Sequence, residues 1–153
     1  KMVIDSTGAV TMPAQPAFQA TATSNGLTDI VAASSWNTIV LGTERFDNNS
    51  DFSSNTFTAP VTGKYQLNAL VYLLNVDSAS QYSEIQLNTS NKNYQAIIST
   101  NQFNGDLAYL TFMLSVLADM DASDTAILQV NIGSGASQTD VSTGTTFSGY
   151  LAC

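Results

Sequence analysis

The segment KYQLNALVYLLN (64–75) decides the fold, because its apolar residues recur at every second position. A helix would need a repeat near 3.6 residues, whereas alternation is the pattern of a strand with one buried face. The face that would point into a core carries Tyr65, Leu67, Ala69, Val71 and Leu73. The segment therefore predicts one long β-strand of a packed sheet.

Further short apolar runs, broken by Gly, Pro, Asn and Asp, lie on both sides of this strand. No long segment combines strong helix formers with a helical period, so the whole chain is expected to be β. Strands are predicted at 17–23, 35–41, 44–48, 56–60, 83–90, 93–99, 107–120, 125–133 and 146–153. Two more short strands are predicted within 3–13, and polar loops at 48–55 and 133–140. The pattern indicates an all-β sandwich or barrel of about ten strands.

The segment LAYLTFMLSVLADM (107–120) is apolar on both faces. Its Thr, Tyr, Phe and Val content favours a strand over a buried helix. Because its own partner sheet covers only one face, a subunit interface would cover the other.

Composition excludes several classes of partner. The 153 residues carry a net charge of −8 and only four Lys and Arg, which are scattered along the chain. Binding to nucleic acid or to an anionic membrane surface needs clustered positive charge. No apolar run approaches the roughly 20 residues of a membrane span. The single cysteine, Cys153, excludes an intrachain disulfide. It is expected to be a small residue that closes the last strand, and a thiol that pairs between chains is the alternative.

The chain contains no histidine, which removes Ser-His-Asp and Cys-His catalysis and histidine metal sites. A pair of carboxylates could still cleave a glycosidic bond. The acidic residues available are interpreted as solvated loop residues: Asp47, Asp51, Asp77, Asp106 and Asp140. We therefore expect no enzyme, no catalytic residues and no cofactor.

The cluster DMDASD (119–124) has oxygen ligands at alternating positions, as a calcium loop does. Asp124 stands where an EF-hand requires Gly, and Val130 where it requires Glu, so an EF-hand is excluded. A turn in which Asp side chains bond their own backbone is preferred, and a looser structural calcium site shared across subunits is the alternative.

Three segments together resemble the globular head domain of complement component one-q, a jelly roll related to tumour necrosis factor. They are FDNNSDFSSNTFTAPVTGKYQLNALVYL (46–73), LADMDASDTAILQVNIG (117–133) and TFSGYLAC (146–153). The 117–133 segment is similar to that family's paired strands joined by a tight acidic turn. The resemblance implies an antiparallel jelly-roll sandwich that forms a threefold homotrimer with one sheet around the axis. The first interface candidates are Leu110, Phe112, Leu114 and Tyr150.

The start of the chain, IDSTGAVTMPAQPAF (4–18), resembles the shaft-to-head junction of bacteriophage tail-fibre and virion proteins. The resemblance implies two parts, an amino-terminal arm or shaft junction (1–15) and a jelly-roll head (16–153). It also implies a non-enzymatic fibre head on the virion surface or outside the cell, whose arm contacts other virion proteins. Such a head would attach to a host-surface glycan or protein. The alternatives are a capsid-decoration or filament subunit, and a glycan-cleaving fibre enzyme.

Exposed aromatic side chains could stack on sugar rings, and residues 80–104 supply the ligand candidates Tyr82, Tyr94 and Phe103. Trp36 is expected in the core or an interface, since alternation places it on the face of Thr38 and Val40.

Overall fold

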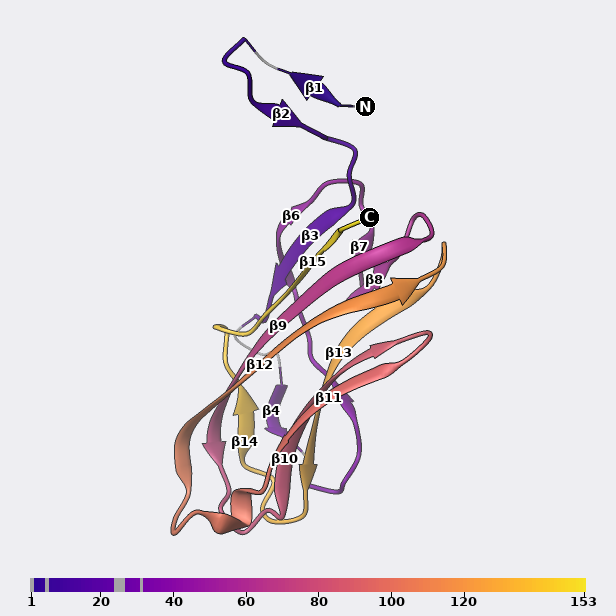
Figure 1. The fold of residues 1–153 in the computed structure, drawn as a ribbon. Coiled ribbons are helices and arrows are strands. Elements are labelled where there is room, and N and C mark those ends of the chain that lie inside the picture. The colour runs from indigo at the N-terminus through magenta and orange to yellow at the C-terminus, as the bar shows by residue number, and fades with distance from the viewer. Residues whose placement is uncertain (1, 5, 24–26, 31) are drawn as a thin grey trace.

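The computed structural model describes residues 2–4, 6–23, 27–30 and 32–153. Two antiparallel sheets stack face to face, and a small hairpin stands apart from them (Figure 1). The first sheet consists of β5 (Asn37–Thr38), β7 (Phe52–Ser53), β8 (Thr56–Thr58), β10 (Tyr82–Thr89), β11 (Asn93–Ile98) and β13 (Thr125–Gly133). The second consists of β3 (Ala17–Thr21), β4 (Leu27–Ile30), β6 (Thr43–Asp47), β9 (Gly63–Val76), β12 (Leu107–Met120), β14 (Thr139–Val141) and β15 (Thr146–Leu151). The hairpin pairs β1 (Val3–Ile4) with β2 (Val10–Thr11), and one short 3₁₀ turn, η1, spans Thr100–Gln102.

Strand β9 is the centre of the seven-stranded sheet. It pairs with β12 along one edge and with β15 and β14 along the other. Beyond β15 lie β3 and then β6. In the six-stranded sheet the order is β11, β10, β13, β8 and β7, and β5 also pairs with β13. The prediction of an antiparallel all-β sandwich is confirmed.

The core lies between the two sheets, where the alternating residues of β9 are buried as predicted from 64–75. An aromatic cluster fills one end. The ring of Phe18 stacks on Phe57 with 4.6 Å between centroids and meets Phe147 edge-on at 5.0 Å. Phe57 also contacts Tyr65 at 5.4 Å, and the Tyr65 hydroxyl donates to the Val61 carbonyl. The motifs Phe-Thr-Ala-Pro, Gly-Lys-Tyr and Phe-Ser-Gly therefore meet in the fold, because their aromatic rings pack on one another.

Several details differ from the sequence prediction. The 48–55 segment is not entirely a loop, because β7 lies within it, and β4 and β14 were not predicted. The strand predicted at 35–41 is reduced to Asn37–Thr38. The turn at 121–124 does not join two paired strands. It leads from β12 in one sheet to β13 in the other, and each pairs with different neighbours.

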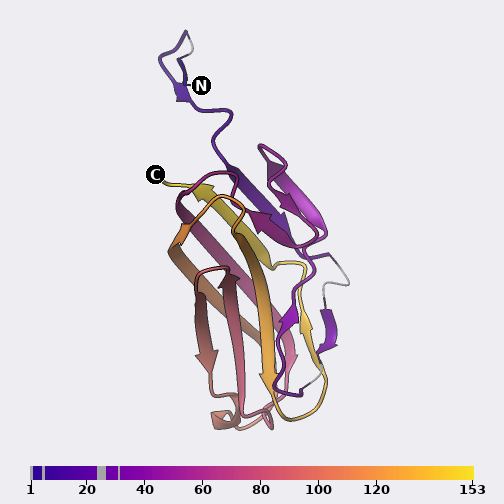
Figure 2. The same cartoon turned by 90° about the vertical axis from the view of Figure 1, so that its right-hand side faces the viewer.

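The β1–β2 hairpin projects from the end of the head where the carboxyl terminus also lies (Figures 1 and 2). Its apolar side chains are exposed, among them Met2, Ile4, Val10 and Met12. The turn η1 and the β13–β14 loop lie at the opposite end (Figure 1). Within the described part of the chain, no helix is long and apolar enough to cross a membrane.

Candidate functional site

The outward face of the seven-stranded sheet carries exposed apolar side chains. On β12 these are Tyr109, Met113 and Leu117, and Met113 has 79% of its surface exposed. Tyr150 on β15 is 48% exposed and stands next to Gln66, which itself pairs with Leu117. A soluble monomer rarely presents several large apolar side chains on one sheet face, so this face is suited to association.

An uncharged polar band crosses the middle of the same face. Gln66 Nε2 donates to Ser115 Oγ (2.9 Å), and Ser115 Oγ donates to Asn68 Oδ1 (2.8 Å). On the outward side of β3, β9, β12 and β15, the described residues between the Lys64–Asp119 pair and Asp140 carry no charge. Burying this band would cost far less than burying charges, because its amides and hydroxyls already bond one another.

The structure separates the four predicted interface residues. Phe112 is only 4% exposed and belongs to the core of the single chain, and Leu110 and Leu114 pack against that core. Only Tyr150 lies on the outward face. Leu110, Phe112 and Leu114 thus lie on the core side of β12, because a strand that is apolar on both faces gives no sequence signal for which face turns inward.

The outward face of the six-stranded sheet has a different chemistry. A row of side chains from four strands forms an amide ladder, defined as Gln95, Gln86, Gln129 and Thr38. Gln95 Nε2 donates to Gln86 Oε1 (3.2 Å), and Gln86 Nε2 donates to Gln129 Oε1 (2.6 Å). Gln129 Nε2 then donates to Thr38 Oγ1 (3.3 Å), and Asn88 Nδ2 also donates to Gln129 Oε1 (3.3 Å).

Two rows further along this face, Tyr82 lies against Gly133, its cross-strand partner. A Cβ atom at Gly133 would stand 2.3 Å from the Tyr82 ring, so the ring lies directly on the strand backbone. Between Tyr82 and the ladder, Asn131 Nδ2 donates to Glu84 Oε1 (2.8 Å). This face therefore combines amides, one carboxylate and a half-buried aromatic ring.

The three ligand candidates do not come together. Tyr82 is half-buried on the face just described, whereas Tyr94 points to the opposite side of β11 and packs against the core. The Lys92 ammonium lies over the Tyr94 ring, 5.2 Å from its centroid. Phe103 is 41% exposed and follows η1 at the end of the head.

The sequence pattern predicted Trp36 in the core or in an interface, and the structure shows that it is not in the core. It is half-buried, and Val40 on the same side is exposed. The buried residues of this segment are Ile39 and Leu41, so the opposite side faces inward. Backbone pairing of Asn37 with Val130 places Trp36 beside the six-stranded face that carries the amide ladder.

The acidic cluster at 119–124 forms a turn. Asp124 Oδ2 accepts hydrogen bonds from the backbone N–H of Asp121 and from Asn91 Nδ2, both 2.8 Å long. Asp121 Oδ1 accepts from the Thr62 hydroxyl, and Asp119 pairs with Lys64. Backbone bonds join Ala59 to both Ser123 and Asp124. Among the described residues, no group of three or more His, Cys, Asp or Glu side chains is arranged to hold a metal ion.

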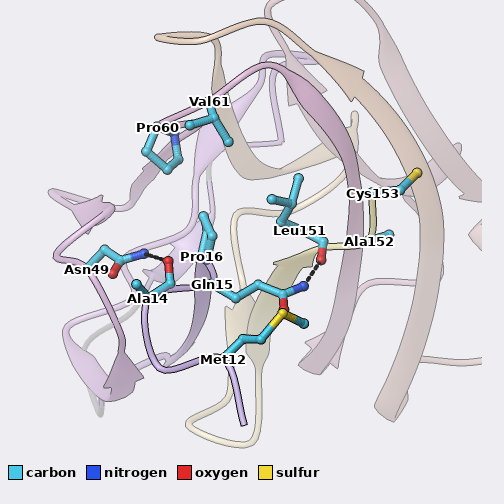
Figure 3. Close-up of a pocket in the computed structure, with 10 residues that line it drawn as sticks. All are labelled: Met12, Ala14, Gln15, Pro16, Asn49, Pro60, Val61, Leu151, Ala152 and Cys153. Carbon is cyan, nitrogen blue, oxygen red and sulfur yellow. Dashed lines mark hydrogen bonds between the residues drawn. The ribbon is translucent and has the colours of Figure 1, made fainter. Parts of the chain in front are cut away.

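A mostly apolar hollow of about 520 Å³ lies where the amino-terminal segment meets the head (Figure 3). Its walls come from separate segments of the chain: Met12, Ala14–Pro16, Asn49, Pro60–Val61 and Leu151–Cys153. The Gln15 side-chain amide donates to the Leu151 carbonyl and ties the Ala14–Pro16 segment to the carboxyl-terminal one. No local sequence pattern indicates this hollow, because its walls come from segments that are far apart in the chain.

The chain has the fold of the complement one-q and tumour-necrosis-factor jelly rolls. The globular domain of zebrafish complement 1qA superimposes with a TM-score of 0.67 at 15% identity, covering 91% of this chain and 98% of that one. Two crystal structures of murine APRIL, at pH 8.5 and pH 8.0, give TM-scores of 0.63 and 0.61 at 11% and 12% identity, and each covers 90% of this chain and 98% of its own. No protein-family model and no curated protein sequence matches the chain. These similarities therefore show the fold.

Proposed function

We propose that the chain is the trimeric head of a bacteriophage fibre, a non-enzymatic module on the virion surface that attaches to the host. The observation that carries the trimer is the exposed apolar face of the seven-stranded sheet. Family members that the sequence resembles pack one sheet around a threefold axis. In this chain the seven-stranded sheet is suited to lie around such an axis, because its outward face bears Tyr109, Met113, Leu117 and Tyr150.

The distribution of apolar side chains on this face favours a closed ring. Met113 and Leu117 lie on β12, at one edge of the sheet, and exposed Phe46 lies on β6 at the other. Two different edges that contact each other in successive copies form a heterologous interface, which closes when the rotation is threefold. Three copies would then bury both edges.

The attachment role follows from the polar surface that such a trimer leaves outside. The six-stranded sheets would face outward in three copies, so three weak sites could act together on one host surface. The apolar β1–β2 hairpin, at the end of the head that carries the carboxyl terminus, is suited to docking on a neighbouring virion protein. The resemblance of 4–18 to a shaft junction suggests the same. An isolated two-stranded hairpin is marginally stable in water, which favours a partner for it.

The hydrogen bonds of Asp47 favour a structural role for the Asp47–Asp51 pair. Burial raises the pKa of Asp51, and the nearby Asp47 contributes to the rise. Asp47 accepts the backbone N–H groups of Asp51 and Phe52 (3.0 and 2.9 Å), so this carboxylate pair holds its own loop. Glycoside hydrolysis needs two carboxylates that face a substrate across a cleft.

Competition for adsorption tests this proposal. Purified head protein, added in excess to the phage and its host, is expected to lower the rate of phage adsorption. Head protein dissociated by a charge at Met113 should compete much less, since avidity requires three linked sites. An adsorption rate that saturating head protein does not lower would contradict an attachment role. It would favour a capsid-decoration or filament subunit, a role that an exposed apolar hairpin also fits.

A further inference from the structure

We infer that the outward face of the six-stranded sheet binds a neutral saccharide through the amide ladder and Tyr82. This inference rests on the proposed attachment function and specifies its ligand and its site. Tyr82 was a ligand candidate from the sequence, whereas the amides of the ladder were not. They become visible only when the strand register places Gln95, Gln86 and Gln129 in one row.

The first support is the hydrogen-bonding capacity of the ladder. A primary amide has two N–H donors and an oxygen with two lone pairs. The Nε2 groups of Gln95, Gln86 and Gln129 each donate one bond along the row. Gln86 is buried in the middle, so the groups offered to a ligand are those of exposed Gln95 and of partly exposed Gln129 and Asn88. Neighbouring sugar hydroxyls both donate and accept, which matches a row of amides.

The second support is that the row is fixed before any ligand arrives. Each glutamine is held by the next one, and the last is held by Thr38. Free glutamine side chains lose considerable rotamer entropy on binding, and these have already lost much of it on folding. A preorganised row can therefore recognise a small polar ligand that flexible surface amides could not.

The third support is the ring of Tyr82. Close contact with Gly133 seats the ring on the sheet, and part of the side chain stays accessible. The apolar C–H face of a pyranose packs on such a ring while its hydroxyls reach polar neighbours. Between the ring and the ladder lies the row that contains Glu84 and Asn131. This row is bordered by half-buried Trp36 and exposed Ile97.

Charge selects the class of saccharide. The described outward positions of β5, β10, β11 and β13 include Glu84 and no Lys or Arg. An acidic sugar would meet this carboxylate and the −8 net charge of the chain without a cation to pair with. The face therefore favours neutral hexoses and N-acetylhexosamines over sialylated or sulfated glycans.

A glycan array tests the inference with the intact protein as it assembles in solution. Wild-type protein is applied to immobilised neutral and sialylated oligosaccharides, beside Gln95→Ala, Tyr82→Ala and Tyr82→Phe. Loss of a ladder amide or of the ring should lower the apparent affinity about tenfold or more, and Tyr82→Phe, which keeps the ring, should retain most of it. The matched control is Gln102→Ala, an exposed amide on η1 that bonds only its neighbour Asn101 among the described residues.

The outcomes separate the inference from the proposed function. The inference is supported if wild type and Gln102→Ala retain neutral glycans while Gln95→Ala and Tyr82→Ala bind them more weakly. The melting temperatures of these variants should be unchanged. If Tyr82→Ala has a lower melting temperature than wild type, the glycan binding of Gln95→Ala and Tyr82→Phe tests the inference instead. The inference is overturned if wild type retains no neutral glycan, or if Gln95→Ala and Tyr82→Ala retain neutral glycans as well as wild type does. A head that blocks phage adsorption yet binds no saccharide would overturn only the inference of saccharide binding. The proposed attachment function would then act through a protein receptor.

Discussion

Gly149 shows how closely the core of this head is packed. It is buried on β15, and a Cβ atom there would stand 2.6 Å from Leu67 Cδ2 and 2.9 Å from Phe18 Cε1. Both contacts are closer than real Cβ atoms tolerate, so the neighbouring side chains would have to move. The glycine of the Phe-Ser-Gly motif is therefore required by the space between the sheets.

Gly149→Ala is expected to destabilise the protein by roughly 1–3 kcal/mol, the usual cost of overpacking a core. Gly105→Ala is the matched control, because no atom lies within 4 Å of the position of its Cβ. Chemical denaturation of both variants measures the effect. Equal stability of the two variants would contradict the packing described around Phe18.

Asp106 fixes the loops at the end of the head opposite the hairpin. Hydrogen bonds from the backbone N–H of Ser78, from Gln138 and from the Ser78 hydroxyl hold the pKa of Asp106 below its ordinary value of 3.8. A carboxyl whose pKa is lowered by folding stabilises the fold above its ordinary pKa. That contribution is lost as the pH falls through the lowered pKa.

Asp106→Asn should therefore melt at a lower temperature than wild type at pH values of about 6. The difference should narrow as the pH falls from about 4 towards 2, because the wild-type carboxyl becomes protonated there. Thermal melts across this range measure it. A gap of constant size at every pH would show that the charge on Asp106 does not contribute.

At the scale of single elements, β12 shows what a strand pattern can and cannot specify. Its bounds at 107–120 were predicted correctly, and its Thr, Tyr, Phe and Val content identified it as a strand. Its inward face was not, because both sets of alternating residues are apolar and the register with β9 decides between them. The core side carries Leu110, Phe112 and Leu114, and the outward side carries Tyr109, Met113 and Leu117.

Adjacent charges on β12 should therefore have different effects. Phe112→Asp buries an unpaired carboxylate in the core and is expected to unfold the chain, at a cost of several kcal/mol. Met113→Asp places the same charge on the outward face and should leave a folded monomer. Circular dichroism reports the fold and sedimentation velocity the assembly. A Met113→Asp protein that keeps the assembly state of wild type would place the interface elsewhere.

The shorter elements were missed for a related reason. β4, β7 and β14 contain only two to four residues, and their polar residues resemble loop sequence. Pairing with longer strands makes them β, and that pairing is a tertiary effect. The acidic turn was placed correctly, but a turn sequence does not state whether the next strand stays in the same sheet.

For the whole molecule, the sandwich follows from periodicity, and the jelly roll follows from motifs whose aromatic residues meet in one cluster around Phe18. The candidate surfaces were much harder to predict. The amide ladder depends on the register of four strands, and the apolar hollow at the arm depends on segments that are far apart in the chain. Neither leaves a local pattern in the sequence.

The two outer faces of the sandwich differ in a way that suits them to different partners. One is apolar with an uncharged band, and we propose that it contacts copies of the same chain. The other carries the amide ladder, and we propose that it contacts saccharide. The first proposal requires that face to be buried, since a monomer would leave its large apolar side chains in water.

Sedimentation equilibrium of the purified chain at micromolar concentration measures whether that face is buried between three copies. A threefold head is expected to sediment as a single species with three times the 16.2 kDa mass of the chain. A stable monomer at that concentration, or a dimer, would contradict the threefold assembly.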